Sequence, residues 1–186
     1  MKPILIIYAT REGHTRRIAE RAGAAIAAEG RTFEVVDAAN LPNGFEVANY
    51  SAAVVAASVH KGKHESEMTQ FVRCHTAWLR QVPTLFLSVS LEEVSAEKAG
   101  ETAARRAEAQ ANVKQLMERF LLETNWRPTR AEPVAWALVY SKYNWLMRFI
   151  MKRIAKKAGG PTDTTRDYEF TDWTRLDRMV RELVHP

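Results

Sequence analysis

Two hydroxyl residues and a glycine stand where a helix is expected to begin near the amino terminus. The first N–H groups of a helix have no backbone acceptors and attract anions. Glycine permits close approach of the backbone, and threonine hydroxyls can donate hydrogen bonds. The pattern predicts a phosphate-binding loop, with an unliganded helix start capped by threonine as the alternative. The residues of this loop are Thr10, Arg11, Glu12, Gly13, His14 and Thr15.

Several other kinds of site are excluded by the residues present. The Thr10–Thr15 loop lacks both the Gly-Lys-Ser/Thr run of Walker loops and the GxGxxG run of dinucleotide-binding loops. Cys74 is the single cysteine, so an intramolecular disulfide and a zinc site with several thiolates are excluded. His60 and His64 have the spacing of a metal pair on a helix, but Gly62 lies between them and no third ligand is evident. We therefore predict no metal site.

Apolar runs alternate with segments of helical periodicity along the chain, which predicts a parallel sheet covered by helices on both faces. Ligands of such folds bind beyond the carboxyl ends of the strands, where the Thr10–Thr15 loop is expected. The predicted strands are Ile4–Ala9, Phe33–Val36, Ala52–Ala57, Thr84–Val89, Val134–Tyr140 and a short one at Asp167–Thr171. The predicted helices are Thr15–Glu29, Glu65–Leu79, Ala96–Glu123 and Asp172–Val184, the last with Asp172 or Thr171 as its N-cap.

The chain length and the position of the charge indicate a single domain that carries one basic element. The 186 residues are 46% apolar and carry a net charge of +5. Six basic residues and no acidic one lie between Lys142 and Lys157, so the rest of the chain is nearly neutral. Read as a helix, this segment has a broad apolar face and an opposite basic face that includes aromatic rings. It is suited either to an anionic membrane surface or to packing its apolar face on the domain.

We predict a domain over residues 1–186 with an insertion at about 141–166 that interrupts the last strand. The opening apolar run is too short for the core of a signal peptide or for a spanning helix. Together with the cysteine content, this predicts a cytoplasmic protein.

The phosphate loop resembles that of the flavodoxin-like family, whose loop reads Thr/Ser-x-Thr-Gly-x-Thr and binds the phosphate of FMN. Glu12 stands in place of the usual hydroxyl residue, and this variant is similar to the bacterial quinone-dependent protoporphyrinogen oxidase subgroup. Three later regions strengthen the resemblance, which spans roughly Pro3 to Val184. They are Ala57–His64, Phe120–Pro128, and the C-terminal third from Tyr140 to Trp173, which includes Gly159-Gly160-Pro161-Thr162-Asp163-Thr164 and Thr171-Asp172-Trp173.

The resemblance implies a doubly wound α/β flavodoxin-like fold, with a five-stranded parallel sheet in the order 2-1-3-4-5 and FMN at the point where the order reverses. The Thr10–Thr15 loop would hold the phosphate, and loops after two other strands would flank the isoalloxazine ring. His14 and Lys61 are candidates for positive charge near the ring. The residues implied to flank the ring are Ser58, Val59, His60, Lys61, Gly62, Ser88, Val89, Ser90 and Leu91.

The implied activity is oxidation of protoporphyrinogen IX to protoporphyrin IX in two-electron steps, with menaquinone or ubiquinone as the acceptor, in heme biosynthesis. No catalytic base is singled out. The basic insertion would meet an anionic inner-membrane surface from the cytoplasmic side, where the quinone is dissolved. The candidates for contact with substrate or membrane are Arg127, Arg130, Lys142, Trp145, Arg148, Lys152 and Arg153.

The sequence is also compatible with two other functions. The chain could be another flavodoxin-fold protein, either an NAD(P)H:quinone reductase or an electron-transfer flavodoxin, although such carriers are usually acidic. It could also be a binding module without flavin that uses its basic helix on a membrane or on nucleic acid, which would give a steep salt dependence. We expect no nucleic-acid partner, and the oligomeric state stays open, with a homo-oligomer as one alternative.

Overall fold

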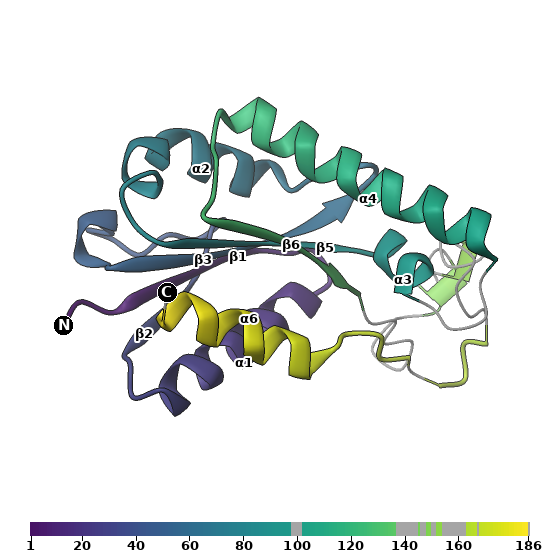
Figure 1. The fold of residues 1–186 in the computed structure, drawn as a ribbon, viewed down its shortest axis with the longest axis horizontal. Coiled ribbons are helices and arrows are strands. Elements are labelled where there is room, and N and C mark those ends of the chain that lie inside the picture. The colour runs from purple at the N-terminus through teal and green to yellow at the C-terminus, as the bar shows by residue number, and fades with distance from the viewer. Residues whose placement is uncertain are drawn as a thin grey trace.

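The computed structural model describes residues 1–97, 102–136, 145, 148–149, 152–153, 163–166 and 168–185. The strands are β1 (Ile4–Ala9), β2 (Phe33–Asp37), β3 (Ala52–His60), β4 (Lys63–His64), β5 (Thr84–Ser90) and β6 (Arg130–Ala135). The helices are α1 (His14–Ala28), α2 (Ser66–Leu79), α3 (Glu92–Glu97), α4 (Ala103–Thr124) and α6 (Trp173–Val184), with a 3-10 turn η1 (Val47–Asn49). Figure 1 shows the sheet as a middle layer, with α2 and α4 on one face and α1 and α6 on the other.

The sheet has the order β2-β1-β3-β5-β6, and these five strands are all parallel. This is the predicted order 2-1-3-4-5 once β4 is left out of the count. β4 is a two-residue strand that pairs antiparallel with the end of β3, and the sequence reading missed it. The predicted fold class is confirmed.

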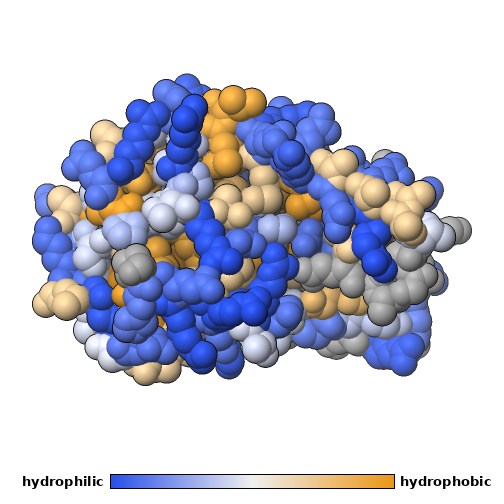
Figure 2. All heavy atoms as spheres, viewed as in Figure 1, coloured by the Kyte–Doolittle hydropathy of each residue, from blue (hydrophilic) through white to orange (hydrophobic). Residues whose placement is uncertain are grey.

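Strand β1 shows why the apolar runs are continuous: each of its six residues is buried. Ile4 and Ile6 point into the core beneath α1 and α6, whereas Leu5 and Ile7 point into the core beneath α2 and α4. A strand covered on both faces has no solvent-facing side, and so needs no polar alternation. On the face of the molecule shown in Figure 2, apolar residues lie in separate small areas between hydrophilic residues.

Pairing in register brings the carboxyl ends of the central strands to one edge. Ala9 at the end of β1 pairs with Ala57 of β3, and Ser58 of β3 pairs with Val89 of β5. The loops that follow these strands therefore meet at the same edge. This edge is the candidate site, because ligands of doubly wound sheets bind where the strand order reverses.

The predicted strand Val134–Tyr140 is wrong in position, because β6 starts four residues earlier, at Arg130. As the last described strand in the sheet order, β6 can hold the charged residues Arg130 and Glu132 and the proline Pro133. Reading apolar character alone placed the strand too late. Residues 137–140 of the prediction lie outside the described residues.

The predicted helix Ala96–Glu123 is also wrong at its start, because two helices cover this region. Ser90 Oγ accepts a hydrogen bond from the Glu93 amide and caps α3. Thr102 has an extended backbone, and its hydroxyl accepts from the Arg105 amide, so α4 begins at Ala103. The composition rich in Ala, Glu and Arg concealed this cap. At α6, by contrast, the N-cap is Asp172, one of the two residues predicted for this position, and its side chain accepts from the Arg175 amide.

Most of the predicted insertion lies outside the described residues, including Lys142 and the Gly159–Thr162 run. The five described residues between positions 145 and 153 are helical, in agreement with the helix predicted there. Of the short strand predicted at Asp167–Thr171, Tyr168 forms an isolated bridge, while Glu169–Thr171 are not in a strand.

Candidate functional site

The Thr10–Thr15 loop, called the phosphate loop from here on, turns from β1 into α1 through Gly13. Gly13 has a φ of 84°, in the left-handed region that favours glycine. Its amide donates to Thr10 Oγ1 at 3.1 Å, which closes the turn. A Cβ atom added at Gly13 would meet no atom within 4 Å, so the space beside the first turn of α1 is open.

Thr15 supplies a hydrogen-bonding group that the described part of the chain leaves unused. Its side chain is 1% exposed, and its Oγ1 has no partner among the described residues. A buried hydroxyl without a partner is unfavourable by about 1–3 kcal/mol. The hydroxyl lies at the start of α1, where unpaired helix amides also attract anions. These groups fit a bound phosphate, and the capping of α1 does not account for them, because its first turn has no side-chain cap.

His14 is part of the loop but does not carry the positive charge that we expected near the flavin. It is 4% exposed, and its Nε2 lies 2.9 Å from Thr171 Oγ1, while that hydroxyl donates to the Ala135 carbonyl at 2.9 Å. Since the hydroxyl has one hydrogen, His14 Nε2 must be the donor to Thr171. Burial lowers the pKa of His14 to about 4. The imidazole is therefore neutral at pH 7, and the expectation is corrected.

The predicted second loop, Ser58–Gly62, is largely strand and turn. β3 runs on to His60, beyond its pairing with β1 and β5, and folds back into β4 through Lys61 and Gly62, with φ values of 50° and 75°. Two successive residues with positive φ are typical of a tight hairpin. Lys61 is exposed at this turn, His60 is half-buried, and Ser58 and Val59 are buried.

His64, on β4, is a buried core histidine. Its Nε2 lies 2.9 Å from Ser88 Oγ, and its ring lies 4.8 Å from the ring of Phe120, centroid to centroid. Burial lowers its pKa to about 4. Within the described ranges, no group of three or more His, Cys, Asp or Glu side chains could hold a metal ion.

Glu65 joins the first two loops, and sequence reasoning missed it. Its carboxylate pairs with Arg11 Nε at 2.8 Å and accepts a hydrogen bond from Ser58 Oγ at 3.1 Å. Glu65 is buried, whereas the Arg11 side chain is about half exposed. No spacing or periodicity distinguishes Glu65 from the neighbouring Glu67; only the fold brings it beside Arg11.

Glu12 is half-buried beside this pair. Its burial raises the pKa of its carboxyl group, with the charge of His60 opposing the rise and that of Glu65 adding to it. Glu12 places a carboxyl group at the position where the flavodoxin-like loop has a hydroxyl residue.

The third predicted segment, Ser88–Leu91, lies at the carboxyl end of β5 and is buried throughout. Ser88 bonds to His64 and Ser90 caps α3, while Val89 and Leu91 belong to the core. The structure therefore brings the ends of β1, β3 and β5 together at one edge. It engages the Ser88 and Ser90 side chains in internal hydrogen bonds.

Two of the predicted substrate contacts lie at the opposite edge of the sheet. Arg130 begins β6 and pairs with Leu85, near the start of β5, and its guanidinium forms ion pairs with Glu132 and Glu182. Arg127 precedes it. Five residues of strand separate Arg130 from the carboxyl end of β6, or roughly 16 Å. The prediction that both residues contact the substrate at the site edge is corrected, because they lie at the amino-terminal end of β6, whereas the site lies at the carboxyl ends of β1, β3 and β5.

The described residues of the basic helix expose both aromatic rings and charge. Trp145 is 81% and Phe149 56% exposed, and the Arg153 guanidinium carbon lies 5.8 Å from the centroid of the Phe149 ring. Lys152 and Arg153 are exposed, and Arg148 is half-buried. Among the helices that the structure describes, none has the length and apolar character needed to cross a membrane.

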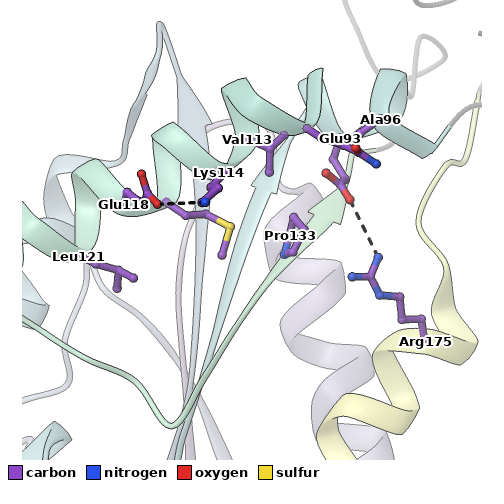
Figure 3. A pocket seen from close by; sticks show the side chains of 10 residues that line it. Glu93, Ala96, Val113, Lys114, Glu118, Leu121, Pro133 and Arg175 are labelled. Atoms are coloured by element: carbon purple, nitrogen blue, oxygen red, sulfur yellow. Dashed lines mark ion pairs between the residues drawn. The ribbon is translucent and has the colours of Figure 1, made fainter. Parts of the chain in front are cut away.

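A cavity of about 490 Å³ lies beside β6, between α4 and the start of α6 (Figure 3). Its apolar wall includes Val113 and Pro133. The dashed lines mark two ion pairs, Lys114–Glu118 at 3.8 Å and Arg175–Glu93 at 3.9 Å. These pairs balance the charge of its lining. The loops described above follow β1, β3 and β5, so this cavity is not the phosphate site.

Comparison with known proteins gives a family match across most of the chain. The family model described as "Flavodoxin domain" matches residues 5–165. Protoporphyrinogen IX dehydrogenase [quinone] of Escherichia coli K12 is 32% identical over 182 residues, which cover 97% of this chain and 94% of that protein. The protein of the same name from Leishmania major is 28% identical, over 97% of this chain and 74% of that protein.

Solved structures share the fold at low sequence identity. A flavodoxin from the domain Archaea has a TM-score of 0.54 and 13% identity, covering 98% of this chain and 96% of its own. The rubredoxin oxygen:oxidoreductase of Desulfovibrio gigas has a TM-score of 0.56 and 13% identity, and this chain spans only 36% of its length. At this identity the likeness establishes the fold alone.

Proposed function

The chain belongs to the flavodoxin family, and from this premise we propose that it is an FMN-dependent protoporphyrinogen IX dehydrogenase that passes electrons to a quinone. Two relatives of that name match nearly the whole chain. Either menaquinone or ubiquinone would serve as the acceptor. The observation that carries the proposal is the buried Thr15 hydroxyl in the phosphate loop, which has no partner among the described residues and can donate to a bound phosphate ester.

The phosphate loop would hold the FMN phosphate. Thr15 would donate its hydroxyl hydrogen, and the first amides of α1 would donate theirs. Gly13 leaves open space on this side of the helix start. Thr10 would act through its own hydrogen bond with Gly13, which holds the turn in shape.

The ring of FMN would lie between the β3–β4 hairpin and the end of β5. Because the Ser88 and Ser90 hydroxyls already have partners in the protein, the end of β5 would reach the ring mainly through its backbone. On the other side, His60, Lys61 and Gly62 form the hairpin turn. Glu65 would keep the hairpin and the phosphate loop at a constant separation through Ser58 and Arg11.

Bound FMN would supply the two-electron redox chemistry. The protein would contribute placement of the ring at the carboxyl edge and a phosphate loop that offers hydrogen-bond donors. Burial keeps His14 neutral, and Arg11 is paired with Glu65. The negative charge of the phosphate would thus be met mainly by hydrogen-bond donors.

The activity is tested by porphyrin fluorescence under anaerobic conditions. Protoporphyrinogen IX is colourless and its oxidised product is fluorescent, so fluorescence should appear only when purified protein, bound FMN and quinone are all present. An electron-transfer flavodoxin would leave the substrate unoxidised with quinone present. That result would overturn the proposed activity while leaving the flavodoxin fold intact.

We also propose that residues 1–186 form one domain in which the 141–166 segment is an insertion that contacts the anionic face of the inner membrane from the cytoplasmic side. The exposure of Trp145 and Phe149 supports this, since aromatic rings favour the interface between headgroups and lipid chains. Lys152 and Arg153 supply charge that such a surface attracts. The quinone is dissolved in that membrane, so the contact would bring it to the flavin.

Replacement of both Lys152 and Arg153 by glutamine should weaken binding to phosphatidylglycerol vesicles about tenfold or more, since each basic residue near such a surface contributes about 1 kcal/mol. Sedimentation with vesicles measures the effect. FMN content should stay at the wild-type level, and neutral phosphatidylcholine vesicles should show no such difference. Equal sedimentation of variant and wild type with the anionic vesicles would contradict the membrane contact.

A further inference from the structure

The tip of the β3–β4 hairpin carries positive charge that no described acid neutralises. Lys61, Gly62 and Lys63 are exposed, and Arg119 of α4 donates from its guanidinium to the Gly62 carbonyl at 3.4 Å. None of these three basic side chains forms an ion pair within the parts of the chain that the structure describes. We call Lys61, Lys63 and Arg119 the hairpin-tip cations.

The hairpin projects beyond the sheet edge where the flavin is proposed to lie. The pairing of β3 with β1 ends at Ala57 and its pairing with β5 ends at Ser58, so His60 pairs only with Lys63 of β4. In Figure 1 the end of β3 rises toward α4, the helix that carries Arg119. Lys63 and Arg119 therefore stand at the rim of the proposed flavin site, next to Lys61 in the hairpin turn that would flank the ring.

Basic residues elsewhere near this edge are paired with acidic residues, unlike the hairpin-tip cations. Arg11 is paired with Glu65, and Arg17 with Glu169 at 3.3 Å. On α4, Lys114 is paired with Glu118. The hairpin-tip cations remain available for an anionic ligand.

We infer that Lys63 and Arg119, with Lys61 beside them, bind the propionate carboxylates of the tetrapyrrole substrate. This inference rests on the proposed function. The propionates are the anionic groups of protoporphyrinogen IX and belong to the same macrocycle as the reacting carbons. A macrocycle at the flavin ring therefore places carboxylates near the rim of the site. Exposed cations attract carboxylates and orient the ring that carries them.

The test is the double variant K63Q/R119Q, which leaves Lys61 in the flavin loop. The KM for protoporphyrinogen IX should rise about tenfold or more, because two charge-assisted contacts are lost. The KM for quinone, which has no charge, should not change. The difference between variant and wild type should shrink in high salt, which screens exposed charges.

Esterified substrate separates recognition of carboxylates from a general defect. With protoporphyrinogen IX dimethyl ester, which has no free carboxylate, variant and wild type should have equal KM values. A matched control, R73Q/R178Q, removes two exposed cations from α2 and α6 and should retain the wild-type KM for the acid. The dissociation constant for FMN, measured by fluorescence quenching, should be unchanged in both double variants.

Each outcome decides the inference separately from the proposed function. An unchanged KM for the acid in K63Q/R119Q, or an equal rise for acid and ester, would overturn it. Loss of sedimentation with anionic vesicles at an unchanged KM would reassign the hairpin-tip cations to the lipid headgroup. If the wild type itself fails to oxidise protoporphyrinogen IX with quinone, the proposed function is wrong. Contact between the hairpin-tip cations and propionates is then still tested by measuring the binding of mesoporphyrin IX to the variant and to the wild type.

Discussion

Replacement of Thr15 by valine should weaken FMN binding by about 10-fold to 100-fold and leave the apoprotein at least as stable as the wild type. A hydrogen bond to a charged group contributes about 1.5–3 kcal/mol. The hydroxyl that would make it has no partner among the described residues, so its removal also removes a buried polar group without a partner. The substitution should therefore weaken FMN binding without lowering the stability of the apoprotein. A merely structural role of Thr15 would not produce this combination.

The dissociation constant from quenching of FMN fluorescence and the urea midpoint of the apoprotein measure these two quantities. Thr10→Val is the matched control. Thr10 Oγ1 already accepts from the Gly13 amide, so its loss should lower apoprotein stability by about 1 kcal/mol. A Thr15→Val variant that is less stable but binds FMN normally would show that the hydroxyl serves the fold and not a ligand.

Acid should destabilise the protein steeply between pH 6.5 and pH 4. Burial lowers the pKa values of His14 and His64 from 6.5 to about 4. In that range the unfolded chain binds protons that the folded protein excludes, so stability is fully present above pH 6.5 and falls as pH decreases. The shift corresponds to about 3 kcal/mol for each histidine, which is large against the usual 5–15 kcal/mol of a domain.

Urea unfolding at intervals from pH 7 to pH 4 tests this dependence. His14→Asn and His64→Asn should each flatten the curve of unfolding free energy against pH, even where they lower its value at pH 7. A slope that neither buried-site variant changes would contradict the assignment of the acid sensitivity to these two residues.

The parallel sheet was predictable because its signal is local. Continuous apolar runs identify β1, β3 and β5, and the turn after β1 contains Thr10, Gly13 and Thr15 together. The last strand was misplaced because Arg130, Glu132 and Pro133 are unusual in a buried strand but acceptable in β6, which ends the described strand order. Local apolar character cannot distinguish a buried central strand from a strand at the end of the sheet order.

The parts of the site that were not predictable depend on contacts between distant segments. Glu65 reaches Arg11 across 54 residues, and His14 reaches Thr171 across 157 residues. The second contact buries His14 and removes the charge that its residue type suggested. The two-residue strand β4 was missed because its register is set by the turn at Lys61 and Gly62. Arg119 becomes part of the hairpin tip only when α4 packs beside it.

Comparing FMN with riboflavin in calorimetric titrations of the wild type and of Thr15→Val tests the central claim most directly, because the two ligands differ only in the phosphate. The account predicts that one FMN binds per chain, at least about 100-fold more tightly than riboflavin, and that Thr15→Val weakens the binding of FMN alone. Equal affinity of the wild type for the two ligands, or no heat with either, would contradict a phosphate-anchored flavin in the Thr10–Thr15 loop.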